Sequence, residues 1–182
     1  MLLKSGFIFL TLVVGAASAQ GSLLLDITST GGTLTDPFGG TYGFAFRVDN
    51  EITIDGLGFW DQGSNGLVGS FDVIVWKADG ELVTSASVDN TSTVVPSASS
   101  DGQWLVTSIV PEPLSPGDYV VGASGVYSFD AFQGSPPPSI SIAQGVTFLE
   151  SREGSANSFP DIADDTNGYV GPTLTIADES VV

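Results

Sequence analysis

The sequence contains no histidine and no cysteine, and these two absences exclude several kinds of chemistry. Without histidine the chain lacks the usual general base, the commonest metal ligand and any Ser-His-Asp triad. Without cysteine it has neither disulfides nor thiolate chemistry. Catalysis or metal binding would therefore have to depend on carboxylates and other oxygen groups.

Basic residues are almost as scarce, because 4 Lys and Arg stand against 21 Asp and Glu, for a formal net charge of −17. Such a surface repels phosphate backbones, which excludes nucleic acid as a partner, and it disfavours anionic membrane surfaces. Sustained helical periodicity is also missing after residue 19. The hydrophobic content of 42% nevertheless argues against disorder, so we expect a folded, acidic domain.

The first 19 residues have the form of a secretion signal. Lys4 precedes an apolar run from Phe7 to Ala17, and the small residues Ala17 and Ala19 flank Ser18 as at a signal peptidase site. We expect cleavage after Ala19 and a secreted, extracellular protein without a membrane span. The mature chain, residues 20–182, would be a single domain of 163 residues, and loss of Lys4 would take its net charge to −18.

Short β-branched and aromatic runs separated by turn signals predict an all-β fold. The expected strands are Ser22–Thr28, Thr41–Val48, Glu51–Trp60, Ser70–Lys77, Glu81–Val88, Gln103–Val110, Gly117–Gly122, Ile140–Leu149 and Tyr169–Ile176. Their number and short links favour a two-sheet antiparallel β-sandwich, jelly-roll-like in its connections, with a closed barrel as the alternative.

Alternation within the strands predicts which residues form the core. A β-bulge is expected at Asp55-Gly56, because Ile54 and Phe59 would otherwise lie on opposite faces of one strand. The pair Asp79-Gly80 predicts a tight hairpin. The expected core comprises Phe44, Phe46, Ile54, Phe59, Val73, Val75 and Val121.

An ordered series of short motifs runs through most of the mature chain. It comprises Gly43-Phe44-Ala45-Phe46-Arg47-Val48, Ile52 to Asp61, Val73 to Gly80, Leu114 to Ala123 and Tyr169 to Thr173. This series resembles the secreted β-sandwich domain of unknown function common in proteins with a PEP-CTERM sorting signal. The resemblance implies no catalytic residues, since that family has no agreed activity. Pro111-Glu112-Pro113 lies inside the domain and no anchor follows it, so export without that sorting step is expected.

The acidic segment near residue 165 is a candidate calcium site. Hard cations prefer clustered carboxylate and amide oxygens, although the spacing here is not that of an EF-hand. The alternative is a solvated acidic loop. The candidate ligands are Asp161, Asp164, Asp165 and Asn167.

The three tryptophans are candidates for stacking on sugar rings. Trp76 shares a strand face with Ile74, which indicates packing, and Trp104 opens a strand and fits either role. Trp60 is the best candidate, because polar residues follow it in a Gly-rich turn. The expected site comprises Trp60, Asp61, Gln62 and Asn65, and the alternative is that Trp60 caps the core.

These features predict a secreted, non-enzymatic binding or structural module, with a polysaccharide or other cell-surface polymer as ligand. A matrix or envelope component that works by self-assembly is the alternative, and a glycoside hydrolase with a carboxylate pair is a more remote one. A binding module should expose aligned aromatics, whereas an assembly module should expose a long edge strand or an apolar patch.

Overall fold

The computed structural model describes residues 21–30, 34–35, 39–125, 133–134, 137–164 and 168–178. Every regular element in these ranges is a β-strand, and every strand pair is antiparallel. The prediction of an all-β antiparallel fold is therefore confirmed. The predicted secretion signal, residues 1–19, lies outside the described residues.

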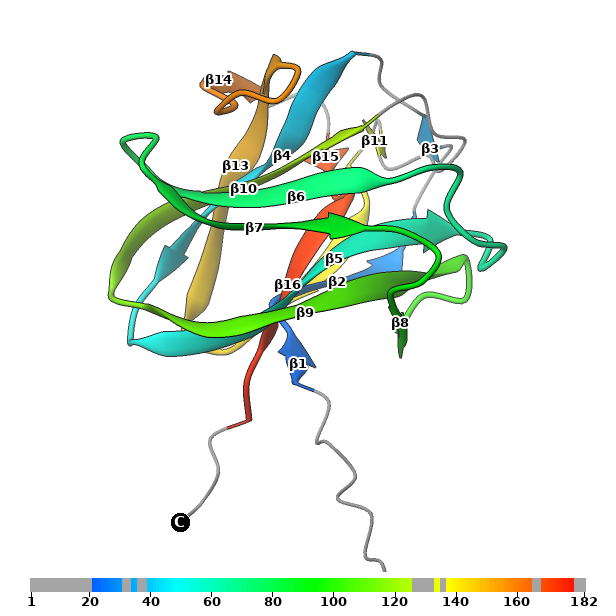
Figure 1. Ribbon diagram of the computed structural model, residues 1–182, viewed down its shortest axis with the longest axis horizontal. Helices are drawn as coiled ribbons and strands as arrows, with labels where there is room; N and C mark the ends of the chain where they lie inside the picture. The colour runs from blue at the N-terminus through cyan, green and yellow to red at the C-terminus, as the bar shows by residue number, and fades with distance from the viewer. Residues whose placement is uncertain are drawn as a thin grey trace, which may run out of the picture.

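Two sheets face each other and form a β-sandwich of jelly-roll type (Figure 1). The six-stranded sheet has the order β14 (Ile162–Asp164), β13 (Val146–Ser155), β4 (Gly40–Val48), β10 (Gly117–Gly125), β6 (Phe71–Lys77) and β7 (Leu82–Val88). The five-stranded sheet has the order β1 (Ser22–Leu23), β16 (Pro172–Ile176), β5 (Ile52–Gln62), β9 (Gly102–Leu114) and β8 (Thr93–Pro96).

Two smaller sheets complete the fold. One pairs β2 (Leu25–Ser29) with β12 (Ser139–Ile142), and the other joins β15 (Gly168–Tyr169), β11 (Gln133–Gly134) and β3 (Leu34–Thr35). Three of the expected strands are divided in the structure, among them the last, which forms β15 and β16. The first breaks at Leu24, and the strand expected over residues 140–149 breaks at a turn around Gly145.

The core lies between the two large sheets. Across the six-stranded sheet, Phe44, Val121 and Val75 stand side by side in register, so their side chains point to the same face. From the other sheet Phe59 stacks on Phe71, with ring centroids 3.7 Å apart. The predicted core is confirmed, since all of its members are buried in one cluster: Phe44, Phe46, Ile54, Phe59, Val73, Val75 and Val121.

The predicted β-bulge in β5 is also confirmed. Against β16, Thr175 pairs with Gly56 and Ile176 pairs with Ile54, so Asp55 is the additional residue of β5. Ile54 precedes the bulge and Leu57 follows it, and both are fully buried. The bulge therefore reverses the alternation once and keeps the apolar side chains of both halves in the core.

The turns decide which strands lie in the same sheet. Asp79-Gly80 closes the β6–β7 hairpin as predicted, with Gly80 in the left-handed region at φ 88°. Asp49 and Asn50 instead join β4 to β5, which belong to opposite sheets. Crossings of this kind make the structure a sandwich rather than a meander.

A short third layer covers part of the outer face of the five-stranded sheet. Hydrogen bonds join the segment 24–27 to three other parts of the chain. Leu24 N donates to Leu174 O of β16, and Trp104 Nε1 of β9 donates to Asp26 Oδ1. Ser99 N, which follows β8, donates to Ile27 O. The segment that includes β2 therefore crosses the sheet instead of continuing along its edge.

Both ends of the described fold leave the molecule at the same end. Ser22 of β1 lies opposite Ile176 of β16, and both strands end at the lower side of the molecule in Figure 1. The strands β14 and β15 lie toward the opposite end of the molecule. In the described part of the chain, no helix is present that could cross a membrane.

Candidate functional site

Trp60 is fully buried, so the predicted exposed indole at this position is wrong. Phe59 faces the core between the sheets, and Trp60, as the next residue of β5, faces the outer side. There it packs against Trp104 of β9, with ring centroids 5.1 Å apart, in the same cluster as Leu25 and Ile27 of β2. The face that alternation assigns to solvent is covered by the third layer.

The polar residues after Trp60 organise a turn. Asp61 is fully buried, and its Oδ1 accepts hydrogen bonds from the backbone N–H groups of Asn65 and Gly66, each at 3.1 Å. Its Oδ2 accepts a bond from Gln103 Nε2 at 2.7 Å. Gln62 is half-buried and Asn65 is exposed. The four predicted residues are thus close in space, but they do not form a surface on which a sugar ring could stack.

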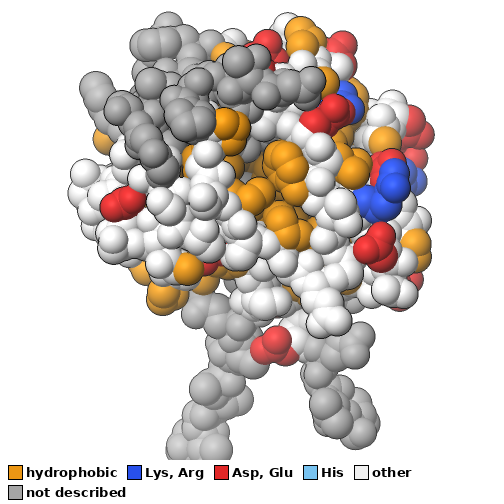
Figure 2. Space-filling model, turned by 180° about the vertical axis from the view of Figure 1, so that it is seen from behind, with side chains coloured by type: hydrophobic (Ala, Val, Ile, Leu, Met, Phe, Trp, Pro, Cys, Tyr) orange, Lys and Arg blue, Asp and Glu red, His pale blue; other side chains and the backbone are white. Residues whose placement is uncertain are grey.

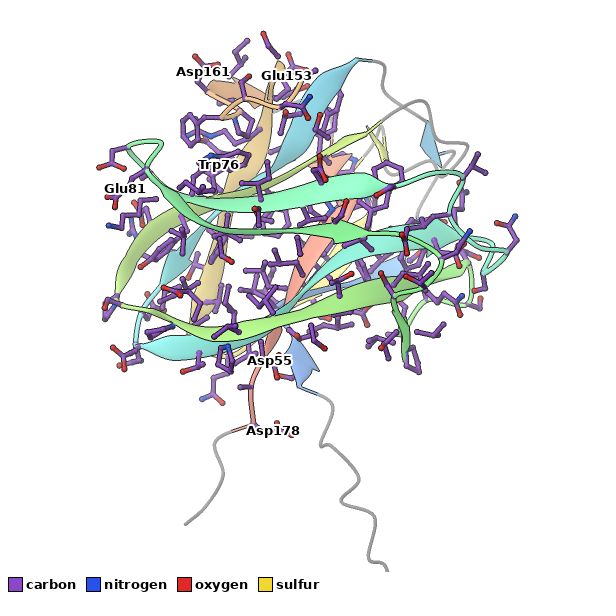
Figure 3. All side chains as sticks on the ribbon, viewed as in Figure 1. Asp55, Trp76, Glu81, Glu153, Asp161 and Asp178 are labelled. Atoms are coloured by element: carbon purple, nitrogen blue, oxygen red, sulfur yellow. The ribbon has the colours of Figure 1, made fainter. Side chains whose placement is uncertain are left out.

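The other two tryptophans are buried as well. Trp104 is fully buried and donates to Asp26. Trp76, for which packing was expected, lies on the outer face of the six-stranded sheet beneath Phe159, whose ring meets it edge-on with centroids 5.8 Å apart. Figure 3 labels Trp76 on that sheet. The described part of the chain therefore presents no row of exposed tryptophans.

Two of the four predicted calcium ligands lie in the described part of the chain, and they do not converge. Asp161 precedes β14 and is exposed, whereas Asp164 ends β14 and is half-buried. Three residues apart in extended chain they face opposite sides, roughly 10 Å from each other. Asp165 and Asn167 lie outside the described residues. Asp161 and Asp164 therefore do not converge on one ion, and the contribution of Asp165 and Asn167 to a calcium site stays a prediction.

The structure does contain an open hollow that the sequence did not indicate. It lies where β12 and β13 diverge from their common turn, and we call it the wedge pocket. The hairpin splays because β12 pairs with β2 while β13 pairs with β4 in the six-stranded sheet. The hollow has a volume of about 220 Å³. Figure 2 shows hydrophobic side chains gathered around a hollow in the middle of the rear face.

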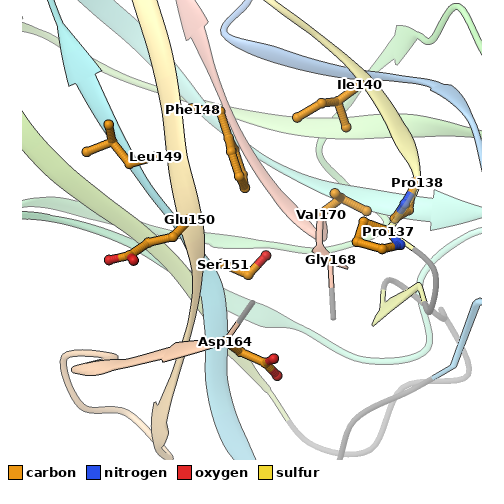
Figure 4. A pocket seen from close by; sticks show the side chains of 10 residues that line it. All are labelled: Pro137, Pro138, Ile140, Phe148, Leu149, Glu150, Ser151, Asp164, Gly168 and Val170. Atoms are coloured by element: carbon orange, nitrogen blue, oxygen red, sulfur yellow. The ribbon is translucent and has the colours of Figure 1, made fainter. Parts of the chain in front are cut away.

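Apolar side chains form most of the wedge pocket, and the polar ones lie at one end. Its lining residues are Pro137, Pro138, Ile140, Phe148, Leu149, Glu150, Ser151, Asp164, Gly168 and Val170 (Figure 4). Ser151 and Asp164 point into the space beside Gly168, whereas Leu149 and Glu150 point away from it. Leu149 is the additional residue of a β-bulge in β13, which explains this change of direction.

Ser151 is the buried polar group of the wedge pocket, with 5% of its surface exposed. Its Oγ accepts a hydrogen bond from Tyr169 N at 3.3 Å, so its hydroxyl hydrogen can be donated to another acceptor. Gly168 packs against Pro137, and a Cβ at Gly168 would lie only 2.8 Å from Pro137 Cβ. Because Gly168 has no side chain, Pro137 can lie close to β15 at this end of the wedge pocket.

Beside the wedge pocket, one tyrosine hydroxyl joins two carboxylates. Tyr169 is buried, and its hydroxyl lies 2.9 Å from Glu153 Oε2 and 3.0 Å from Asp164 Oδ2. Burial raises the pKa of Tyr169 far above its ordinary value, and the hydrogen bonds to Glu153 and Asp164 raise it further. The phenol therefore stays protonated and holds both carboxylates near it.

This pair of carboxylates is relevant to the glycoside hydrolase alternative. Both bonded oxygens lie about 3 Å from one phenol oxygen, so their separation is at most about 6 Å, within reach of the spacing of retaining enzymes. Asp164 lines the wedge pocket, but Glu153 lines a different hollow beside Tyr42. The two carboxylates therefore do not face one common space in which a glycosidic bond could lie between them.

Comparison with protein-family models, with curated proteins and with solved structures gives no match. The functional argument therefore depends on the site itself. One sequence pattern is related to the wedge pocket. A run of prolines ends at Pro138, and Gly145 interrupts the strand expected over Ile140–Leu149. That pattern indicates a stiff connection and a turn, but not that the two arms of the turn diverge.

Proposed function

We propose that this protein is a secreted, non-enzymatic binding module, and that the wedge pocket takes a sugar residue of a polysaccharide or other cell-surface polymer. The observation that carries the proposal is the open apolar hollow between β12 and β13, into which a buried hydroxyl and a carboxylate point.

The chemistry of the lining suits a sugar ring. The C–H face of a pyranose is apolar and can cover the half-buried ring of Phe148 and the side chains of Pro137 and Val170. Its hydroxyl groups need both donors and acceptors, which the Ser151 hydroxyl and the Asp164 carboxylate supply. Few polar groups on a mostly apolar wall are typical of ligand sites.

The size of the wedge pocket favours one ring. A volume of about 220 Å³ lies below the usual range of sites that enclose larger ligands. This is room for a single sugar residue, so the remainder of a polymer would lie outside. The walls belong to strands that also contribute to the core, since Phe148 packs 5.6 Å from Phe44, centroid to centroid. A preformed site of this kind limits the ordering that binding requires.

Affinity electrophoresis through gels that contain soluble polysaccharides tests the proposal. The gels should include a neutral glucan, a cationic glucosamine polymer and an anionic polyuronate. We expect retardation by the neutral or the cationic polymer and not by the polyuronate, which the net charge of −17 repels. A tag at the C-terminus suits this experiment, because Ile176 at the end of β16 is not among the residues that line the wedge pocket.

Two variants locate the site. Phe148→Ala removes the apolar floor and should abolish the retardation while leaving the fold intact by circular dichroism. Val110→Ala is the matched control, because Val110 is 86% exposed on β9, distant from the wedge pocket in sequence and outside its lining. If no polymer retards the parent protein, or if both variants behave like the parent, the proposal is wrong.

Self-assembly is the second candidate, and an open sheet edge favours it. β7 is the last strand of the six-stranded sheet, seven residues long, and Leu82 at its start is 59% exposed. The edge β8 of the other sheet has only four residues and ends in Pro96, which is poor for pairing. Sedimentation velocity over a range of concentrations should detect oligomers that Leu82→Lys removes. A monomer at all concentrations contradicts this candidate.

A further inference from the structure

We infer that the polymer continues from the wedge pocket into a second sugar subsite further along β13, so that the protein binds a linear, non-acidic glycan lengthwise. The inference rests on the proposed function and specifies how its ligand lies. Its basis is a second hollow on the same face of the sheet. We call it the tyrosine hollow, and its lining includes Gly40, Tyr42, Glu153, Ser155 and Ile162.

The register of the six-stranded sheet places the two hollows one after the other. On β13, Ser151 of the wedge pocket lies opposite Phe44 of β4, and Glu153 of the tyrosine hollow lies opposite Tyr42. On the other side of β13, the strand β14 continues both rows. Side chains two residues apart on a strand point to the same face and lie about 7 Å apart. Both rows are therefore on the face of the sheet that Phe44 presents to the core.

One buried tyrosine lies between the two hollows. The hydroxyl of Tyr169 is 2.9 Å from Glu153 Oε2 and 3.0 Å from Asp164 Oδ2, and its ring packs on Tyr42 with centroids 5.0 Å apart. Asp164 points into the wedge pocket, whereas Glu153 lines the tyrosine hollow. Figure 3 labels Glu153 toward the end of the molecule where β14 lies. The two hollows therefore adjoin at this hydroxyl, one on each side of it.

The tyrosine hollow has the groups that a sugar ring requires. The half-buried ring of Tyr42 and the side chain of Ile162, which is 54% exposed, offer apolar surface. The exposed Ser155 can donate and accept through its hydroxyl. A Cβ at Gly40 would lie 2.7 Å from Tyr42 Cζ, so the lack of a side chain there lets the ring lie against β4. The volume of about 250 Å³ is close to that of the wedge pocket and fits one ring.

The carboxylates define the class of the ligand. An ionised carboxylate has about four lone-pair sites, so Glu153 can accept sugar hydroxyls besides the hydroxyl of Tyr169. A uronate in the tyrosine hollow would place its own carboxylate beside Glu153 and Asp164, and like charges at short range repel each other. The ligand should therefore be rich in hydroxyl groups and free of acidic ones.

The extent of the two hollows requires more than one sugar residue. From Phe148 in the wedge pocket to Ser155 in the tyrosine hollow, β13 extends for about 20 Å. A short oligosaccharide can fill only one hollow, whereas a longer one can fill both. The second contact then forms without a second loss of translational freedom. Affinity should therefore rise with chain length until both hollows are filled.

Isothermal titration with oligosaccharides of graded length tests the inference. The probes are β-1,4-linked glucose oligomers of about two to six residues and the corresponding glucosamine oligomers, which match the neutral and cationic polymers used above. In the series that binds, we expect the hexasaccharide to bind at least about tenfold more tightly than the disaccharide, because it fills both hollows. Phe148→Ala should weaken every oligomer of that series, since it removes the floor of the wedge pocket.

Two variants locate the second subsite. Tyr42→Ala should remove the gain from chain length, weakening the hexasaccharide about tenfold toward the affinity of the disaccharide. Glu153→Gln keeps the shape of the side chain and an acceptor for Tyr169, and it should weaken the hexasaccharide about fivefold, because a carboxylate accepts stronger hydrogen bonds than an amide. The control Glu51→Gln makes the same change of charge at an exposed residue outside both linings and should have no effect.

The outcomes separate the inference from the proposed function, provided that thermal melts show each variant to be folded. Equal affinity for the disaccharide and the hexasaccharide, both weakened by Phe148→Ala, overturns the second subsite and leaves the wedge pocket as a site for one sugar. A gain from chain length that Tyr42→Ala and Glu153→Gln leave unchanged also overturns it, because the chain then lies elsewhere. Binding of none of the oligomers or polymers overturns both.

Discussion

Two regions of this protein teach opposite lessons about where binding groups lie. The segment 60–65 combines an indole, a carboxylate and two amides in six residues, yet the fold buries the indole and the carboxylate. The wedge pocket lies between two strands of mixed apolar and polar residues, and its side chains border open space. A concentration of recognition chemistry in sequence does not create a site unless the tertiary structure leaves one side of it uncovered.

The physical difference between the two regions is the number of layers. At Trp60 the chain has three layers, because the segment with β2 crosses the outer face of the five-stranded sheet. At the wedge pocket two strands of one hairpin diverge to different partners, β2 and β4, so that neither covers the space between them. The following predictions test this contrast in order of decreasing effect.

Trp60→Ala should produce the largest effect. Because the indole is fully buried, its loss should lower the free energy of unfolding by about 3–5 kcal/mol. Phe148→Ala should have a smaller effect on stability, since Phe148 is only half-buried, and should act mainly on binding. Chemical denaturation of both variants measures the difference. Equal destabilisation would show that the two regions do not differ as described.

Asp61→Ala tests whether the carboxylate in the turn is structural. Its removal leaves the N–H groups of Asn65 and Gly66 and the amide of Gln103 without their acceptor, which should lower the free energy of unfolding by about 2–3 kcal/mol. Asp72→Ala, at an exposed carboxylate on β6, is the control and should have little effect. If Asp61→Ala unfolds like the parent but loses glycan retention, the turn is the binding site after all.

The two buried indoles should differ when each is replaced by phenylalanine. Trp104 Nε1 donates to Asp26, whereas Trp60 Nε1 is buried without a hydrogen-bond partner among the described residues. Trp104→Phe removes a hydrogen bond to a charged group, so it should be less stable than Trp60→Phe by about 1–2 kcal/mol. Paired urea titrations measure this difference, and the reverse order would contradict the packing described for the third layer.

Tyr169→Phe should remove the hydrogen bonds of the phenol at neutral pH and should also make stability less sensitive to alkaline pH. The pKa of Tyr169 in the folded protein is raised above its unfolded value of about 10. The contribution of the Tyr169 phenol to the free energy of unfolding is therefore fully present below a pH of about 10. It is lost as the pH rises toward the folded pKa, because the unfolded state releases the proton first. Melting temperatures from neutral pH to above 10 should fall less steeply for Tyr169→Phe than for the parent. Parallel curves would contradict the raised pKa.

Much of the fold could be predicted from local patterns. Alternation placed Phe44, Phe46 and Val121 in the core, the parity conflict between Ile54 and Phe59 located the bulge at Asp55, and Asp79-Gly80 marked the β6–β7 hairpin. These features depend on residues that are close in sequence. Alternation also placed Trp60 correctly on the face opposite Phe59, but it says nothing about what lies on that face.

The candidate site was less accessible to such patterns. The exposure of Trp60 depends on residues 24–27, and the wedge pocket depends on which strands pair with β12 and β13. Asp161 and Asp164 are close in sequence, but extended chain directs their side chains to opposite sides. In each case the deciding contact joins segments far apart in sequence or depends on the local strand geometry.

By itself, the sequence determined the chemistry available to this protein. It determined an all-β chain with an acidic surface, without thiols or imidazoles, and with alternating strands whose apolar faces must be buried, since these follow from composition and from periods of two residues. Only the tertiary structure decided which aromatic and acidic groups remain accessible. The covering of Trp60 by the crossing of β2, the divergence of β12 from β13, and the meeting of Glu153 and Asp164 at Tyr169 all depend on long-range pairing, which a local pattern does not encode.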